Sequence, residues 1–239
     1  MKLLLISNST LAGQPFLDYP KHEIANFLGK EIKKTLFIPY AAVTFTFDNY
    51  EKKVQERFSE LGYTVDSIHK YSNPVEAVNQ AEAIVVGGGN TWQLTKMLQD
   101  NNLIEPIRQK VLNGTPFVGW SAGANVACPT IRTTNDMPII EPQSFNALGF
   151  VPFQINPHYL DANPVGHAGE TREARIEEFI EVNKHVFVVG LREGSMLKVI
   201  DNNIELIGNH TLRIFKYGTP AYECDKNADL NFLLKNYDV

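Results

Sequence analysis

A serine set between two glycines is the first residue whose surroundings suggest chemistry. The stretch Gly119-Trp120-Ser121-Ala122-Gly123 has the pattern G-x-S-x-G, and it lies between the apolar run Pro116–Val118 and Ala124–Ala127, which can begin a helix. A sharp turn from strand to helix needs small neighbours, because the serine backbone must adopt a strained conformation that exposes the hydroxyl. The pattern is also common by chance, and a plain turn in which Ser121 caps a helix explains it equally well.

Two backbone amides are candidates to act beside this serine. The amide of Ala122 would point towards an oxyanion formed at the hydroxyl, aided by the positive end of the helix dipole. A second turn, Gly87-Gly88-Gly89-Asn90-Thr91, follows another apolar run. Its Gly88 amide is the expected second donor, because the turns of a parallel sheet meet at the carboxyl ends of the strands. Trp92 stands where a dinucleotide fingerprint needs a third small residue, which argues against a nucleotide cofactor.

A nucleophilic serine needs a base, and His158 is the best placed of the six histidines because it ends a β-like run downstream of the serine turn. Two carboxylates compete to orient its imidazole. Asp136 lies in an irregular segment, whereas Glu193 lies just past the end of the expected strand Val186–Gly190. No metal is expected, because His158 and Asp161 have no partner at a metal-ligand spacing such as H-E-x-x-H.

Short apolar runs alternate with amphipathic stretches along the chain, which predicts a mostly parallel sheet covered on both faces. The expected strands are Lys2–Ser7, Thr35–Pro39, Thr64–His69, Ala83–Val86, Pro116–Gly119 and Val186–Gly190. The expected helices are Phe47–Leu61, Thr91–Leu98, Ile104–Leu112 and Arg172–Val182. Two β-like runs around Asp201-Asn202-Asn203 predict a hairpin at the sheet edge, and Leu212–Tyr217 adds a strand. We expect one domain over residues 1–239.

The composition restricts the classes of partner. Lys and Arg number 22 against 27 Asp and Glu, giving a net charge of -5, which does not suit a nucleic-acid surface or a polybasic membrane patch. The two cysteines are too few for a disulfide framework, and no apolar stretch has the length of a signal segment or a membrane helix. We expect a cytoplasmic protein that has no cofactor and binds neither nucleic acid nor membrane. The sequence leaves a homo-oligomer open.

Five motifs, in this order, resemble peptidase E, the family of aspartyl dipeptidases. They are Gly87-Gly88-Gly89-Asn90-Thr91, Gly119-Trp120-Ser121-Ala122-Gly123-Ala124, Thr134-Asn135-Asp136-Met137-Pro138, Asn156-Pro157-His158 and Gly169-Glu170-Thr171-Arg172-Glu173. The resemblance implies an α/β sheet of glutamine-amidotransferase-like (flavodoxin-like) architecture. It also implies a serine exopeptidase that hydrolyses small acidic peptides, namely dipeptides with an N-terminal aspartate.

Carried over by position, Ser121 is the nucleophile, His158 the base and Asp136 the charge-relay acid of the family. Strand position favours Glu193 for the same acid role, so both carboxylates stay candidates.

Substrate binding is assigned in the same way. The resemblance implies that Arg172 grips the aspartyl carboxylate, and Asn90 is a second candidate for substrate binding. The commoner role of an arginine among acids is a surface ion pair, here with Glu170 or Glu173.

Other functions compete with this one. The same machinery suits an esterase or amidase, or a hydrolase like cyanophycinase, and the glycine turns suit a flavodoxin-like module that binds phosphate or flavin. A glutaminase is disfavoured because Ser121 stands where a cysteine would be expected. The irregular segment Thr130–Phe150 has the length of a functional loop or lid.

Overall fold

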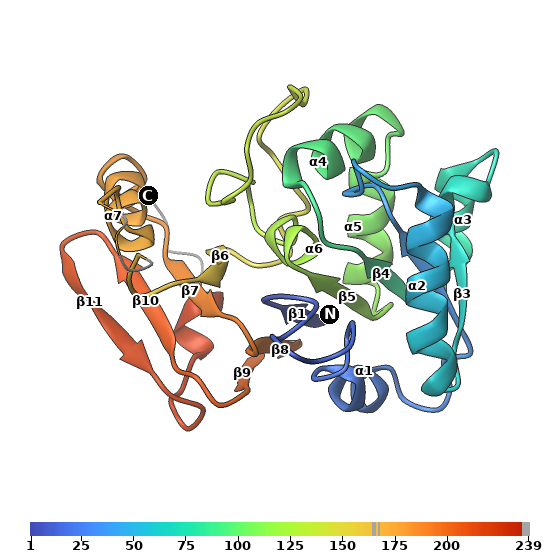
Figure 1. The fold of residues 1–239 in the computed structure, drawn as a ribbon, viewed down its shortest axis with the longest axis horizontal. Coiled ribbons are helices and arrows are strands. Elements are labelled where there is room, and N and C mark those ends of the chain that lie inside the picture. The colour runs from blue at the N-terminus through green and yellow to red at the C-terminus, as the bar shows by residue number, and fades with distance from the viewer. Residues whose placement is uncertain (164–165, 167, 236–239) are drawn as a thin grey trace.

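The computed structural model describes residues 1–163, 166 and 168–235, and its largest feature is a seven-stranded sheet of order β3-β2-β4-β5-β1-β8-β9 (Figure 1). Its parallel strands are β1 (Lys2–Ile6), β2 (Lys34–Ile38), β3 (Thr64–Ser67), β4 (Ile84–Val86) and β5 (Phe117–Trp120). The strands β8 (Met196–Ile200) and β9 (Asn203–Ile207) form an antiparallel hairpin that extends the sheet beside β1. The expected α/β class and the edge hairpin are confirmed.

Helices cover both faces of this sheet. As a result, nearly every residue of its central strands is buried. Leu4 of β1 and Phe37 of β2 pack with the helices α1 (Lys21–Leu28) and α2 (Phe47–Glu60). Leu5 of β1 faces the other way, towards α3 (Pro74–Gln80), α4 (Thr91–Asp100) and α5 (Ile104–Leu112). All four helices that the sequence predicts are present, and each begins at the predicted residue. The sequence analysis did not predict α1 and α3.

A second sheet, of order β11-β10-β7-β6, lies beside the first (Figure 1). Its strands are β6 (Gln154–Tyr159), β7 (Val188–Arg192), β10 (Leu212–Lys216) and β11 (Thr219–Cys224), and β6 pairs with β7 in parallel. The helix α7 (Arg172–Val182) packs on it through Ile176 and Ile180. The expectation that Val186–Gly190 joins the main sheet was therefore wrong. An apolar run predicts a buried strand but does not indicate which strand pairs with it.

The two sheets share a buried cluster that contains Leu5 of β1 and Val189 of β7. The single-domain interpretation stays a prediction. Residues 130–150 contain no helix or strand, apart from an isolated bridge between Thr130 and Asn146. The remaining helices are short, namely α6 (Ala122–Asn125), η1 (Ile68–Lys70) and η2 (Asn231–Leu234). Within the described residues, no helix has the length and apolar character needed to cross a bilayer.

Candidate active site

Ser121 lies at a strained turn between β5 and α6. Its φ is 54° and its ψ is −113°, a conformation that non-glycine residues rarely adopt. A Cβ atom on Gly119 would lie 2.4 Å from the carbonyl oxygen of Gly123, and one on Gly123 would lie 2.2 Å from that of Val86. Packing therefore requires both glycines of the motif. The Ser121 side chain caps no amide of α6, so its hydroxyl is available for another role.

The hydroxyl of Ser121 belongs to a chain of two hydrogen bonds. Its Oγ lies 2.9 Å from His158 Nε2, and His158 Nδ1 lies 2.6 Å from Glu193 Oε1. The register of β6 shifts at His158, whose φ is 53°, while Glu193 directly follows β7. A hydroxyl, an imidazole and a carboxylate in this order form the arrangement that activates a serine nucleophile.

The carboxylate of Asp136, the charge-relay acid that the resemblance implies, contacts Thr91 and Thr134. Its Oδ2 accepts hydrogen bonds from Thr91 N (2.7 Å), Thr91 Oγ1 (2.6 Å) and Thr134 Oγ1 (3.1 Å). Thr91 is the first residue of α4, where the helix dipole stabilises a negative charge. The Asp136 carboxylate thus anchors the 130–150 segment to α4. The hydrogen bond to the imidazole is made by Glu193.

Buried side chains that the sequence analysis did not single out hold the base and the acid in place. The Oγ of Ser7 accepts from His158 N (2.9 Å) and donates to the carbonyl oxygen of Leu191 (2.8 Å). The Oδ1 of Asn8 accepts from the amide of Gly194, beside the candidate acid, at 2.9 Å. Their position at the carboxyl end of the first parallel strand could have identified Ser7 and Asn8 as site residues from the sequence.

The two expected amide donors lie close to the serine. A Cβ atom on Gly88 would lie 2.9 Å from Ser121 Cβ, so only glycine allows this approach. Ala122 is the first residue of α6, and its N–H has no acceptor within the helix. The carbonyl oxygen of Gly88 accepts from Tyr50 OH (3.0 Å), which in turn accepts from Trp120 Nε1 (3.0 Å). These bonds fix the glycine turn against the strand that carries the serine.

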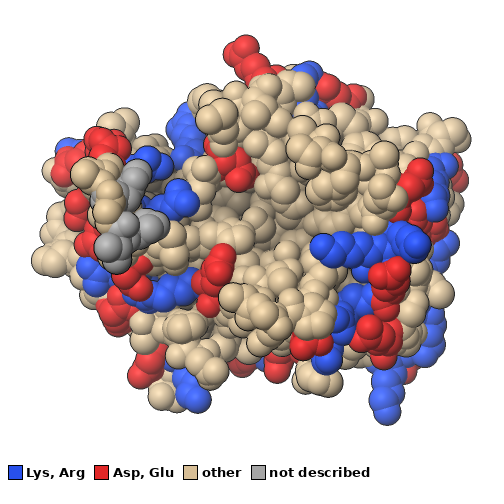
Figure 2. Space-filling view, viewed as in Figure 1, with Lys and Arg blue, Asp and Glu red and all other residues tan. Residues whose placement is uncertain are grey.

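Ser121, His158 and Asp136 line both halves of a cleft, which Figure 2 shows as a hollow in the middle of the molecule. One half, the aromatic half, has a volume of about 590 Å³, and its walls include the rings of Phe16, Phe45, Tyr50 and Trp120 together with Lys53. The other half has a volume of about 440 Å³ and is more polar, with Thr91, Thr134, Asn135, Arg172 and Glu193 among its lining residues. The candidate nucleophile thus faces two chemically different compartments.

Arg172 contributes a guanidinium group to the polar half of the cleft. Its Nη1 donates to Asn135 Oδ1 at 2.6 Å, and among the described residues no carboxylate pairs with it. Burial lowers its pKa, and the nearby Arg175 lowers it further, while Asp136 acts in the opposite direction. Its two expected surface partners are engaged elsewhere, since Glu170 lies 3.6 Å from Arg175 and Glu173 lies 2.8 Å from Arg213. Arg172 is therefore a partly desolvated cation with a neutral partner.

Asn90 does not line either half of the cleft. It is the N-cap of α4, where its Oδ1 accepts from Gln93 N (3.1 Å) and its Nδ2 donates to the carbonyl oxygen of Met137 (2.9 Å). Both ends of the amide are thus used in holding the helix and the 130–150 segment, as N-cap residues commonly are. The expected substrate-binding role of Asn90 stays a prediction.

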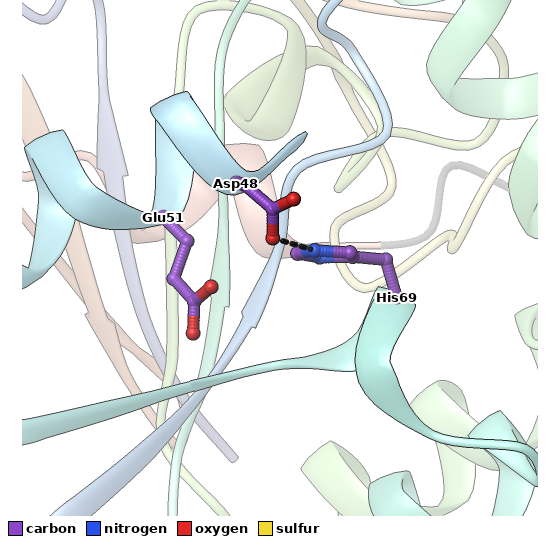
Figure 3. Close-up of side chains that lie close together, drawn as sticks. All are labelled: Asp48, Glu51 and His69. Carbon is purple, nitrogen blue, oxygen red and sulfur yellow. Dashed lines mark hydrogen bonds and ion pairs between the residues drawn. The ribbon is translucent and has the colours of Figure 1, made fainter. Parts of the chain in front are cut away.

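A cluster of possible metal ligands lies at α2 and η1 (Figure 3). Asp48, Glu51 and His69 each offer one ligand atom, and these three atoms lie within 4.8 Å of one another. His69 hydrogen-bonds Asp48 Oδ1 through Nε2 (3.0 Å) and Ser67 through Nδ1 (2.7 Å). The ammonium of Lys70 lies 2.5 Å from Glu51 Oε2, so the carboxylate of Glu51 already has a cationic partner. The sequence analysis did not identify this cluster, although Asp48 and Glu51 share a helix face.

The sequence is similar to known peptidases over most of its length. The family model described as peptidase family S51 matches residues 3–207. Peptidase E of a Nostoc strain is 53% identical over 234 residues, which cover 98% of this chain and 97% of that protein. Peptidase E of Salmonella arizonae is 48% identical over 221 residues, covering 92% and 96%.

Two solved structures share the fold. A peptidase from an acI-B1 Actinobacterium superposes with a TM-score of 0.68 at 18% identity, covering 95% of each chain. A candidate peptidase E protein from Listeria monocytogenes EGD-e superposes with a TM-score of 0.65 at 20% identity, covering 87% of this chain and 98% of that one. At such identities the likeness concerns the fold alone. The sequence matches carry the assignment: the chain belongs to peptidase family S51, and it is a hydrolase, a serine-type dipeptidase.

Proposed function

We propose that this enzyme hydrolyses dipeptides with an N-terminal aspartate, through an acyl-enzyme on Ser121. The observation that carries the proposal is the chain of hydrogen bonds from Ser121 Oγ through His158 to Glu193, set in a cleft that also holds Arg172. The serine oxygen attacks the peptide carbonyl carbon while His158 Nε2 takes its proton. Glu193 holds the imidazole and stabilises its charged form.

The remaining steps return the enzyme to its starting state. The amides of Gly88 and Ala122 donate to the oxyanion of the tetrahedral intermediate. His158 then gives its proton to the leaving amine, the C–N bond breaks, and the aspartyl group stays esterified to Ser121. A water molecule, deprotonated by the same imidazole, attacks this ester, and the imidazole returns the proton to Ser121 Oγ as the ester C–O bond breaks and aspartate is released.

Arg172 supplies the selectivity for aspartate. A carboxylate that enters the cleft loses water, which is costly unless a cation receives it. With a net charge of -5 the protein as a whole does not attract an acidic peptide, so the recognition must be local. Arg172 lacks a carboxylate partner among the described residues, and its guanidinium can offer parallel, charge-assisted hydrogen bonds.

The substrate's α-ammonium group also needs a partner. The carboxylates of Asp136 and Glu193 both line the polar half of the cleft. The three described hydrogen bonds of the Asp136 carboxylate all go to Oδ2, which leaves Oδ1 for the ammonium. A free amino terminus would therefore be required, as in an exopeptidase. No observation favours an esterase, a cyanophycinase-like hydrolase or a flavin-binding module over this function.

The experiment is a peptide screen with the purified enzyme, using Asp-Leu, Asn-Leu, Glu-Leu and N-acetyl-Asp-Leu. We expect rapid release of leucine from Asp-Leu and far slower release from the other three. Asn-Leu tests the charge that Arg172 would receive, and the acetylated peptide tests the free amine. Equal rates on Asp-Leu and Asn-Leu, or faster cleavage of the acetylated peptide, would contradict the proposal.

A further inference from the structure

We propose that Lys53 binds the free C-terminal carboxylate of the leaving amino acid, which makes the aromatic half of the cleft a subsite for a terminal residue. This inference rests on the proposed function, which places the N-terminal aspartate in the polar half. It adds a recognition element for the other end of the dipeptide. It also explains why a peptidase with an open cleft would act on dipeptides rather than on longer chains.

The charges of the two compartments match those of the substrate. An Asp-Xaa dipeptide carries an α-ammonium, a β-carboxylate and a C-terminal carboxylate at neutral pH. The polar half offers Arg172 for the β-carboxylate and Asp136 for the ammonium. The third charge lies on the other side of the peptide bond that Ser121 attacks. Among the described residues that line the aromatic half, Lys53 is the one lysine or arginine.

The charge of Lys53 is not neutralised by the protein. Its Nζ lies 4.3 Å from the centroid of the Phe16 ring, and among the described residues no carboxylate pairs with it. Arg57, one turn further along α2, is in contrast within 3.4 Å of Asp18 and 2.5 Å of Glu60. An aromatic face attracts an ammonium without cancelling its charge. Lys53 is thus held at the cleft and can still pair with an anion.

The ring beneath the ammonium is itself fixed. Phe16 contacts Tyr50 and Trp120 edge-on, with ring centroids 6.4 and 6.1 Å apart, and its carbonyl oxygen accepts from Arg57 Nε at 2.9 Å. The ring therefore gives the ammonium of Lys53 a fixed seat at the edge of the cleft. The aromatic walls, with Phe45, suit an apolar side chain on the leaving residue.

The test compares Asp-Leu with Asp-Leu amide, which lacks only the terminal negative charge. The variants are Lys53→Met, which keeps an apolar stem over Phe16, and Lys53→Arg, which restores a cation. Lys52→Met is the matched control, because Lys52 is the adjacent exposed lysine on α2 and does not line the cleft. For each enzyme, kcat and KM are measured for both peptides.

We expect the wild-type enzyme to prefer the free acid, with the preference residing mainly in KM. Lys53→Met should reduce the ratio of kcat/KM for acid over amide by about three- to fivefold, as expected for an ion pair at an exposed lysine. Lys53→Arg should restore part of the ratio, and Lys52→Met should leave it unchanged.

A wild-type enzyme that cleaves both peptides equally would overturn the role of Lys53, and so would a Lys53→Met variant that keeps the wild-type ratio. In both cases the cleavage of Asp-Leu would leave the proposed function intact. Failure of the wild-type enzyme to cleave either peptide would overturn the proposed function and this inference together.

Discussion

The hydroxyl of Ser7 accepts a 2.9 Å hydrogen bond from the backbone amide of His158, which lies 151 residues further along the chain. Ser7 is fully buried and directly follows β1, whose neighbour β5 leads to Ser121. The same hydroxyl donates to the carbonyl oxygen of Leu191 in β7, two residues before Glu193. One small side chain therefore connects the sheet of the candidate nucleophile to the strands of the base and the acid.

Ser7→Ala should lower both stability and turnover. The variant leaves the partly buried amide of His158 without its acceptor, which costs about 1 kcal/mol in the free energy of unfolding. Because the imidazole is no longer fixed, we expect kcat for Asp-Leu to fall by about tenfold or more, with little change in KM. Chemical denaturation and steady-state kinetics measure the two effects.

Ser67→Ala is the control for this prediction, because Ser67 is also fully buried and hydrogen-bonded but lies in β3. It should lose stability with normal kcat. A Ser7→Ala enzyme with unchanged kcat would show that the bond to His158 does not position the base.

Glu193→Gln and Asp136→Asn should affect different kinetic parameters. Glu193 hydrogen-bonds the imidazole, so its neutral isostere should lower kcat by roughly 10²-fold or more. Asp136 anchors α4 and is proposed to receive the substrate ammonium, so its isostere should act mainly by raising KM. Circular dichroism checks that both variants are folded. A collapse of kcat in Asp136→Asn beside a normal kcat in Glu193→Gln would reverse the assignment.

Arg172→Ala should remove the preference for aspartate. We expect kcat/KM for Asp-Leu to fall by an amount that corresponds to roughly 1.5–3 kcal/mol of lost transition-state stabilisation. The value of kcat/KM for Asn-Leu should change little. Arg175→Ala is the matched control, since it removes a nearby, more exposed guanidinium that already pairs with Glu170. If the Arg172→Ala enzyme retains the wild-type ratio between the two peptides, another group recognises the aspartyl side chain.

Thiol reagents should not inactivate the native enzyme through Cys128. This thiol is fully buried, and its burial raises its pKa to about 12. The reactive thiolate is therefore scarce at pH 8, and the side chain is out of reach of solvent. Mass spectrometry after iodoacetamide treatment should find Cys128 unmodified in the native protein and modified in the denatured one. Rapid native modification at Cys128 with parallel loss of activity would contradict this.

Much of the fold and site could be predicted because local signals coincide with the tertiary structure. Gly119 and Gly123 mark a turn that no larger residue could form, and the sequence shows this directly. His158 and Glu193 were selected as candidates because each lies at the carboxyl end of an expected strand, where ligands of parallel sheets gather.

Other features depend on contacts between distant segments. The choice between Asp136 and Glu193 turned on the path of the 130–150 segment, which has no regular period and is held by hydrogen bonds to Thr91. The second sheet was missed because β7 has the same apolar pattern as a central strand. The role of Ser7 depends on an amide 151 residues away, which no local pattern reveals.

We propose that Ser121 is the nucleophile of an Asp-Xaa dipeptidase. A fluorophosphonate probe, followed by peptide mapping, tests it most directly when hydrolysis of Asp-Leu is measured on the same samples. We predict a single modified residue, Ser121, with activity lost in proportion to labelling and with protection by Asp-Leu. Folded Ser121→Ala protein should not be labelled, and its kcat should be lower by ~10⁴- to ~10⁶-fold. Labelling at another residue, or near-normal turnover by Ser121→Ala, would contradict the claim.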